Sequence, residues 1–314
     1  MSEIVVVGSM NMDFVVSVER YPQRGETIIG KEFLMSPGGK GANQAATIGN
    51  LGGDVTFLAA CGKDIFGDQL LTNLKSFGVN VEHVIRCEDT PTGIASITLE
   101  SKGENRIVVI PGANHRLSVS NIERLAEEIK KAKVVLLQLE IPLETVLRTI
   151  EIAYEHNIQV VLDPAPARKL PEEIYAKIDY ILPNEGEITQ LCAGYNLITE
   201  KERINKLLAL GVGGILITKG EQGVTYYSTE QTITQPAIQT KVVDTTGAGD
   251  IFAGAFVFGL QKGWALEDSI KFATCAAGLS VARQGAQSSI PTFTEVKEAL
   301  QVMDPSSYQK LFCA

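Results

Sequence analysis

The chain has 314 residues, which is enough for one large α/β domain or for one domain with a small addition. Hydrophobic residues make up 45% and charged residues 21%, and the formal net charge is −9 at pH 7. The sequence has no stripe of lysine and arginine and no apolar run of membrane-spanning length, so we expect neither a nucleic-acid nor a membrane partner.

The cysteine and histidine content argues against metal centres and disulfides. The number of cysteines is odd, none forms a C-x-x-C pair, and the three histidines are scattered. The N-terminus does not show the basic segment and long apolar segment of a signal peptide. We therefore predict a cytoplasmic protein with reduced thiols. The cysteines are Cys61, Cys87, Cys192, Cys275 and Cys313.

The first third of the chain mixes extended and helical segments. Hydrophobic spacing predicts strands over residues 4–7, 14–18 and 27–29, a helix over 41–51, a strand over 55–60, a helix over 65–77, and a hairpin with strands 94–99 and 106–110. The early extended segments interrupt the alternation of strands and helices. We therefore expect residues of about 13–33 and 92–110 to form a small separate β-sheet that acts as a lid near the ligand crevice.

From residue 118 onward, strands and helices alternate regularly. The predicted strands cover 134–137, 159–162, 180–182 and 214–218, with an edge hairpin at 223–227 and 231–235; the predicted helices cover 118–131, 143–156, 185–192, 200–210, 250–261, 266–283 and 294–300. This alternation predicts an α/β fold with a mostly parallel sheet covered by helices on both faces. We expect one domain from residue 1 to 303, followed by a flexible tail at 304–314.

The most informative motif is D-T-T-G-A-G-D at residues 244–250. Gly247, Ala248 and Gly249 precede an apolar run over residues 251–260, and Asp250 stands at the junction. A glycine-rich turn that opens a helix leaves backbone N–H groups free, and the helix dipole adds positive potential at the same place. The motif therefore predicts an anion hole for a phosphoryl group beside Asp250, whose carboxylate can take the proton of an attacking hydroxyl.

A second glycine-rich segment, P-G-G-K-G-A-N at residues 37–43, comes before a predicted helix. Its glycines let the backbone approach a ligand closely, and Lys40 and Asn43 offer donors at the start of the helix. It is not a Walker A loop, because Gly41 rather than Ser or Thr follows Lys40. A plain strand-to-helix turn is the alternative interpretation.

Two further candidates follow strands in the first half of the chain. Asn11 and Asp13 come after the first strand, where they either hold vicinal hydroxyls or serve turn chemistry. Glu140 follows the strand at 134–137, at the end where open α/β sheets bind ligands. Both placements predict contact with a ligand in the crevice.

Two more candidates follow strands in the second half. Asn184 and Glu187 come after the strand at 180–182, where they either bind a ligand or cap the next helix from its N-cap and N3 positions. Thr218, Gly220 and Gly223 follow the strand at 214–218 and offer a flat backbone edge to a purine. Because carboxyl ends of parallel strands share one edge of a sheet, all these candidates predict a single crevice.

Together these motifs resemble those of the ribokinase-like (PfkB) carbohydrate kinase family, from residue 8 to about 291. D-T-T-G-A-G-D is similar to the family's C-terminal signature and G-G-K-G-A-N-Q-A to its N-terminal one, whereas Asp163 stands where members often carry Asn. The resemblance implies a Rossmann-like α/β core with a β-sheet lid, and a homodimer in which two lids clasp. It also implies transfer of the γ-phosphate of ATP to the 5-hydroxyl of ribose.

The resemblance also implies roles for individual residues. Asp250 would be the general base, with an anion hole formed by Gly247, Ala248 and Gly249. The residues implied to hold the sugar are Asn11, Asp13, Gly39, Lys40, Asn43 and Glu140. Those implied to bind the nucleotide are Asn184, Thr218, Lys219, Gly220, Gly223 and Gly249, and Glu187 would bind Mg²⁺.

A monovalent cation, K⁺, is implied beside the anion hole. Its matching positions, most of which would act through backbone carbonyls, are Asp244, Thr246, Ser280, Arg283, Gly285 and Ser289. Asp244 is the informative position, because a hard cation prefers a carboxylate.

The identity of the sugar rests on few side chains. Kinases of 2-deoxyribose, fructose or 2-keto-3-deoxygluconate stay open as alternatives, as does a non-catalytic sugar-sensing relative. Asn11 can bond a hydroxyl that 2-deoxyribose lacks, and a buried amide left unpaired costs about 1–3 kcal/mol. We therefore expect a preference for ribose over 2-deoxyribose.

Overall fold

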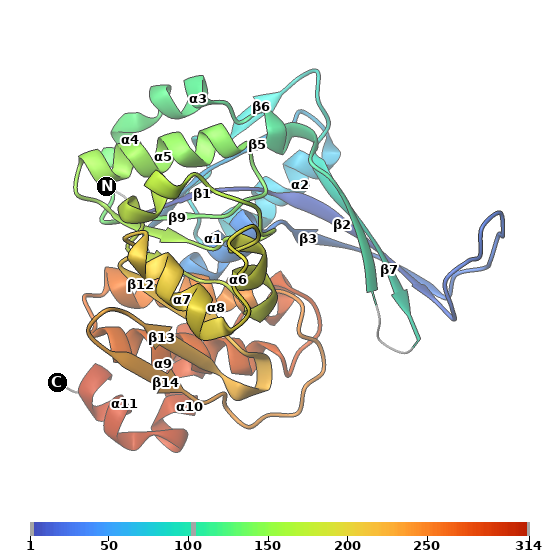
Figure 1. Cartoon of the computed structure of the whole chain (residues 1–314). Helices are drawn as coiled ribbons and strands as arrows, with labels where there is room; N and C mark the ends of the chain where they lie inside the picture. Colours follow the sequence, from blue (N-terminus) through green and yellow to red (C-terminus); the bar gives the residue numbers. More distant parts are fainter. Residues whose placement is uncertain (1–2, 102–104, 313–314) are drawn as a thin grey trace.

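The computed structural model of the protein describes residues 3–101 and 105–312, and its centre is an eight-stranded sheet (Figure 1). The strand order is β14-β13-β12-β11-β10-β9-β1-β4; the six strands from β4 to β12 are parallel, and β13 and β14 add an antiparallel edge. The strands are β1 (Ile4–Val7), β4 (Val55–Leu58), β9 (Val134–Leu137), β10 (Gln159–Leu162), β11 (Tyr180–Ile181), β12 (Gly214–Thr218), β13 (Val224–Tyr227) and β14 (Thr232–Gln235). The mostly parallel α/β sheet expected from the sequence is confirmed.

Alternate residues of the central strands pack into two separate cores. In β1, Ile4 and Val6 belong to one hydrophobic cluster, whereas Val5 and Val7 belong to the other. Successive strand side chains point to opposite faces, so a wholly apolar strand requires helices on both sides. One face is covered by α1 (Lys40–Asn50), α2 (Ile65–Ser76), α8 (Ala248–Gln261), α9 (Leu266–Ser280) and α10 (Phe293–Met303). The other is covered by α3 (Val119–Arg124), α4 (Ala126–Lys130), α5 (Leu143–Glu155), α6 (Glu185–Leu191) and α7 (Glu200–Ala209).

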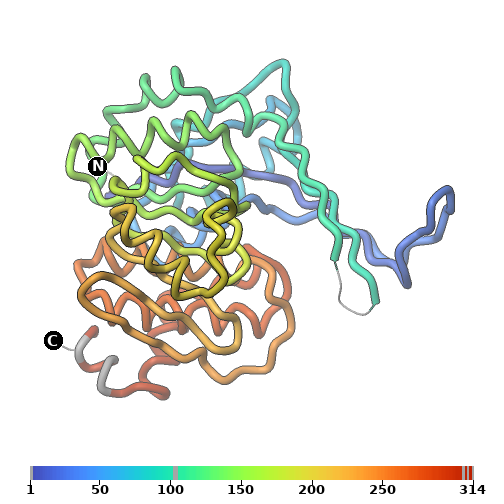
Figure 2. The backbone as a smooth tube through the Cα atoms, viewed as in Figure 1, coloured from blue at the N-terminus to red at the C-terminus, as the bar shows by residue number. Residues whose placement is uncertain are grey.

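A second, four-stranded sheet projects from the core (Figures 1 and 2). It is ordered β3-β2-β7-β8, with bounds β2 (Asn11–Val18), β3 (Glu32–Gly38), β7 (Gly93–Glu100) and β8 (Asn105–Ile110). The small sheet expected from the sequence is therefore present, although it extends to residue 38. Its predicted turn residues 102–104 lie outside the described residues.

The strand expected at 27–29 is wrong. The partner of β2 is instead β3, which contains Pro37 opposite Met12. Proline interrupts hydrogen bonding and is confined to edge strands, and β3 is the edge of this sheet. The proline and glycines of this segment therefore concealed a strand that sequence reasoning treated as a loop.

Several helix ends also differ from the expectation. The helix expected at 118–131 is divided at Leu125, whose N–H bonds both Asn121 and Ile122 carbonyls and tightens the turn. Residues expected to form a flexible tail contain α11 (Pro305–Phe312), and Phe312 lies 5.9 Å from the Trp264 ring and 5.6 Å from the Phe293 ring. Cys313 lies outside the described residues. Among the described residues, no helix combines the length and apolarity needed to cross a membrane.

Candidate active site

The N-terminus of α8 lies at the carboxyl edge of the central sheet and is built by a left-handed glycine. Gly247 has φ 77° as the N-cap, and a Cβ there would lie 2.9 Å from Ala286 Cβ. Among the described residues no side chain caps this end. Gly247, Ala248 and Gly249 line a cavity of about 200 Å³. The Ala248 N–H donates to the Thr245 carbonyl at 3.2 Å. The other N–H groups of a first helical turn have no partner within the helix, and together with the helix dipole they suit this turn to an anion.

Asp250, the third residue of α8, is oriented by two amides from α1. Its Oδ2 accepts a hydrogen bond from Asn43 Nδ2 at 2.8 Å, and its Oδ1 accepts one from Gln44 Nε2 at 3.1 Å. The carboxylate is only 6% exposed, yet Asp250 lines the same cavity as the α8 N-terminus. The structure therefore brings the two glycine-rich segments of the sequence together at one acid.

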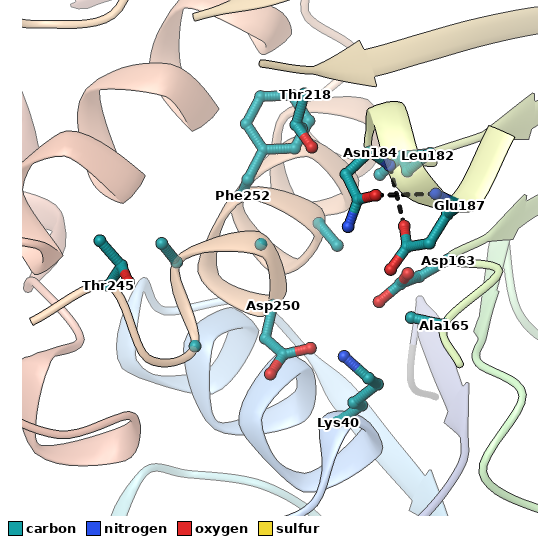
Figure 3. Close-up of a pocket in the computed structure, with 14 residues that line it drawn as sticks. Lys40, Asp163, Ala165, Leu182, Asn184, Glu187, Thr218, Thr245, Asp250 and Phe252 are labelled. Atoms are coloured by element: carbon teal, nitrogen blue, oxygen red, sulfur yellow. Dashed lines mark hydrogen bonds between the residues drawn. The ribbon is translucent and has the colours of Figure 1, made fainter. Parts of the chain in front are cut away.

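Lys40 lies opposite Asp250 in this cavity. Figure 3 shows its amine between the carboxylates of Asp250 and Asp163. Burial disfavours the charged amine, but the attraction of Asp250, Asp163 and Glu140 outweighs burial and raises the Lys40 pKa. Lys40 therefore stays protonated and can meet an anionic ligand.

Asp163 and Glu187 form the opposite wall of the cavity (Figure 3). Burial raises the pKa of the Asp163 carboxyl, and Gln44 Nε2 donates to its Oδ2 at 2.7 Å. Asn184 and Glu187 form a reciprocal capping box at the start of α6, with both bonds at 2.8 Å. The capping interpretation of these two residues is confirmed, and both also line the cavity.

The residues expected to bind the sugar gather where the lid meets the core. Asn114 Nδ2 donates to Asn11 Oδ1 at 2.8 Å, so the oxygen of the Asn11 amide is engaged within the protein. Glu140 accepts bonds from Ser9 Oγ at 2.5 Å and from the Lys40 N–H at 3.2 Å. Burial, with Glu140 and Asp250 nearby, raises the pKa of Asp13 to about 7.

One glycine is required for the approach of lid and core, and a second for packing within the lid. Gly39, the N-cap of α1, has φ 87°, and a Cβ there would lie 2.7 Å from the Asn11 nitrogen and push β2 away from α1. A Cβ on Gly38 of β3 would clash with the Asp13 carboxylate of the neighbouring strand β2.

A second cavity of about 540 Å³ adjoins the first and shares Thr218, Ala248 and Gly249 with it. Gly220 and Gly223 line it together with apolar side chains, among them Val242. Its size and apolar wall suit a flat heterocycle. Lys219, expected near the nucleotide, donates to Glu200 at 2.6 Å and lines neither cavity.

The residues expected at a cation site surround one loop beside the α8 N-terminus. Asp244 accepts bonds from Thr246 N and Oγ1 and from the Gly285 N–H. Burial opposes ionisation of Asp244, but these bonds outweigh it and lower its pKa. The Arg283 guanidinium bonds Glu295, so its side chain is engaged elsewhere. Ser280 is buried at the C-terminal end of α9, and Ser289 is buried at the end of the short helical turn 287–289.

Sequence reasoning missed several residues of the site. Gln44 contacts Asp250 and Asp163, while Ser9 and Asn114 orient the sugar-facing residues. Gln44 follows Asn43 directly in the G-G-K-G-A-N-Q motif, which is a signal that could have found it. Asn114 lies in a short 3-10 helix, η1 (Gly112–Arg116), and no motif marks it.

A base and an anion-binding helix tip in a parallel α/β sheet define an enzyme that transfers a phosphoryl group to an alcohol. The chain matches the model of the pfkB family carbohydrate kinases over residues 1–293. It belongs to that family, as the motifs indicated, and is a carbohydrate kinase.

Individual relatives agree with the family assignment. The chain is 42% identical to a ribokinase of Lactococcus lactis, covering 98% of this chain and 100% of the relative. It is 36% identical to a deoxyribokinase of Salmonella typhi, covering 96% and 99%. Its fold is similar to that of an Arabidopsis thaliana ribokinase complexed with ribose and ATP, with a TM-score of 0.88, 34% identity, and coverage of 96% and 99%.

Proposed function

We propose that the protein transfers the γ-phosphate of ATP to the 5-hydroxyl of D-ribose. The observation that carries the proposal is the position of Asp250, which lies at the anion-binding tip of α8 and is bonded to Asn43 of the sugar-facing helix. Asp250 takes the hydroxyl proton as the phosphoryl group arrives. The N–H groups of Gly247 and Gly249 and the Lys40 amine stabilise the charge on the transferred group, whereas the Ala248 N–H already donates to the Thr245 carbonyl.

The test is a coupled ADP-release assay with purified protein over a panel of sugars: ribose, 2-deoxyribose, fructose and 2-keto-3-deoxygluconate. The proposal expects the highest kcat/KM with ribose. Turnover of none of these sugars would favour the non-catalytic alternative.

The main alternative substrate is 2-deoxyribose, because one similar relative is a deoxyribokinase. The Asn11 amide favours ribose, since its oxygen is occupied by Asn114 and its N–H groups would therefore be the ones to meet an acceptor on the sugar. Loss of that acceptor leaves a buried donor unpaired, at a cost of about 1–3 kcal/mol. We expect kcat/KM for ribose to exceed that for 2-deoxyribose by about 5–150-fold, and equal values would contradict the role of Asn11.

Mg²⁺ fits the first cavity. Asp163 and Glu187 offer carboxylate oxygens there, and Mg²⁺ is commonly held by one or two carboxylates together with substrate phosphates. Within residues 3–101 and 105–312 no group of three or more His, Cys, Asp or Glu residues is arranged as a metal site, so no all-protein cage is proposed. When bound, Mg²⁺ neutralises charge on the phosphates; we assign Glu187 to it.

K⁺ fits the loop beside the anion hole, where Asp244 supplies a carboxylate of lowered pKa. We propose that carbonyls around Ser280, Gly285 and Ser289 complete the site. Titration of K⁺ into enzyme in a sodium-free buffer should raise kcat. Asp244→Ala should remove the dependence, and an unchanged rate with and without K⁺ would exclude the site.

The lid sheet is proposed to close over the sugar and to join two subunits. Its register places Val15, Leu34 and Ile107 on the same face as Asp13, and Leu34 and Ile107 are each 52% exposed. A second copy of the same apolar face would cover them. Sedimentation equilibrium should show a dimer in the cytoplasmic enzyme, and Ile107→Glu should convert it to a monomer.

A further inference from the structure

Asn43 stands between Asp250 and Gln287, a residue that has been given no role so far. Asn43 is 7% and Gln287 5% exposed. Asn43 Nδ2 donates to Asp250 Oδ2 at 2.8 Å, and Asn43 Oδ1 accepts from Gln287 Nε2 at 3.0 Å. Both ends of the Asn43 amide are therefore engaged, and its orientation is determined by its two neighbours.

The direction of this chain of amides follows from chemistry alone. An ionised carboxylate only accepts, so Asn43 must present its nitrogen to Asp250 and its oxygen to Gln287. Gln287 must then present its nitrogen to Asn43, and its own oxygen accepts from Asn73 Nδ2 at 2.5 Å. The amides of Asn73, Gln287 and Asn43 therefore each donate toward Asp250, and the last donor of this series, Asn43 Nδ2, bonds the proposed base.

The other oxygen of Asp250 is held in a similar way. Gln138 Nε2 donates to Gln44 Oε1 at 2.5 Å, which turns the Gln44 nitrogen toward Asp250 Oδ1. Two amides that pull on different oxygens prevent rotation of the carboxylate about its bond to Cβ. The remaining lone pairs are then fixed in direction, which is what proton removal from a positioned hydroxyl requires.

The residues just before Gln287 also contact the turn that precedes α8. Gln287 opens η4 (Gln287–Ser289), and the preceding Ala286 lies against Gly247, the N-cap of α8. The next residue back, Gly285, donates its N–H to Asp244. A single short segment therefore contacts the anion hole, the proposed cation loop and, through Asn43, the base.

We propose that Gln287 is a positioning residue that fixes the amide polarity of Asn43 and thereby the orientation of Asp250. The proposal rests on the assignment of Asp250 as the base of the kinase. Gln287 lines neither cavity, and its effect on the reaction passes through Asn43.

The kinetic test compares two near-isosteric substitutions in the full-length enzyme. Gln287→Glu keeps the acceptor for Asn73 but presents an acceptor to Asn43 Oδ1. Asn43 then stands between two carboxylates and can donate to only one of them, and whenever it donates to residue 287 its oxygen faces Asp250. Gln287→Met removes both bonds but leaves Asn43 free to follow Asp250. We expect Gln287→Glu to lower kcat on the order of 10–100-fold with the KM for ATP within about threefold, and Gln287→Met to lower kcat by less than about fivefold. Equal loss of kcat in both variants would overturn the proposal.

A second test detects the orientation of the Asn43 amide from thermal stability, without any measurement of turnover. In Asp250→Asn the new amide nitrogen is a donor, and it cannot bond the Asn43 nitrogen, which is also a donor. Gln287→Glu favours the turned Asn43 amide, whose oxygen can accept from that new donor. The melting temperature of the double variant Asp250→Asn with Gln287→Glu should exceed the value obtained by adding the two single shifts. The matched pair with Gln287→Met should be additive, and additive shifts in both pairs would overturn the proposal. This measurement uses no substrate, so inactivity of the wild-type enzyme toward ribose would refute the proposed function separately.

Discussion

Replacement of Asp250 by Asn removes the base while changing the volume of the side chain very little. The catalytic cost follows from the loss of proton removal, which contributes about 10²–10⁴ in rate, or ~3–5 kcal/mol at ~1.4 kcal/mol for each factor of ten. The stability cost is smaller. Each carboxylate oxygen of Asp250 now accepts one amide N–H, from Asn43 and Gln44, and Asn can accept only one of them. The unpaired donor costs about 1–3 kcal/mol in a side chain that is 6% exposed.

The assay is ADP release at saturating ribose and ATP, together with thermal unfolding of the same preparation. We expect kcat to fall 10²–10⁴-fold while the protein still unfolds cooperatively at a temperature a few degrees lower. Asp179→Asn is a matched control, because Asp179 Oδ2 accepts the Val160 N–H at 2.7 Å before the start of β11, at the sheet edge opposite to the site. The control should change stability and leave kcat unaltered. A kcat of Asp250→Asn within tenfold of the wild type would refute the assignment of the base.

Three further predictions concern two glycines and the half-buried acid Asp13. Gly249→Ala should keep or raise the melting temperature, because a Cβ there meets no atom within 4 Å and alanine favours helix, but should raise the KM for ATP because Gly249 lines both cavities. Gly41→Ala should lower the melting temperature, because its Cβ would lie 2.7 Å from the Gly8 Cα; an unchanged value would mean that α1 and β1 separate easily. Asp13→Asn tests the raised Asp13 pKa of about 7. Between the ordinary pKa of 3.8 and a pH of about 7, the folded state holds a proton that the unfolded state has lost. The stability of the wild type therefore falls as the pH rises through this window. The unfolding free energy of Asp13→Asn relative to the wild type should therefore increase by about 2–4 kcal/mol from pH 4 to pH 8 in denaturant titrations, and a difference that does not vary with pH would contradict the pKa.

The sequence was sufficient for the strands that are buried on both faces. Segments such as Val134–Leu137 and Ile4–Val7 are short, wholly apolar and followed by polar residues, and each is a strand over those residues. The edge strand Glu32–Gly38 was missed, because it carries a charge, a proline and exposed side chains, and only its pairing with β2 makes it a strand. Local pattern predicts the core of this fold well and its lid less well, since the lid depends on contacts between distant segments.

In the site, too, local features were predictable from the sequence and contacts between distant residues were not. Asp250 and the glycines before it were predicted because a helix N-terminus is a local feature, readable from neighbouring residues. The bonds that orient Asp250 join residues 206 and 207 positions apart, and Gln287 lies 244 positions from Asn43. No periodicity within one segment encodes such pairs. The sequence predicts which residue stands at the helix tip, whereas the structure is needed to see what holds it.

The way in which the site carboxylates are held bears on how ligands enter. Exposed carboxylates of this chain pair with cations, as Glu26 does with Arg20. In contrast, Asp250 is held by two neutral amides and Glu140 by a hydroxyl and a backbone N–H. Neutral donors fix the geometry of both carboxylates, while the protonated Lys40 amine attracts them electrostatically. A neutral sugar can therefore dock against these acids directly. The phosphates of a nucleotide, by comparison, meet favourable potential at the α8 N-terminus and the Lys40 amine, which directs the transferred group to one end of the acid-lined crevice.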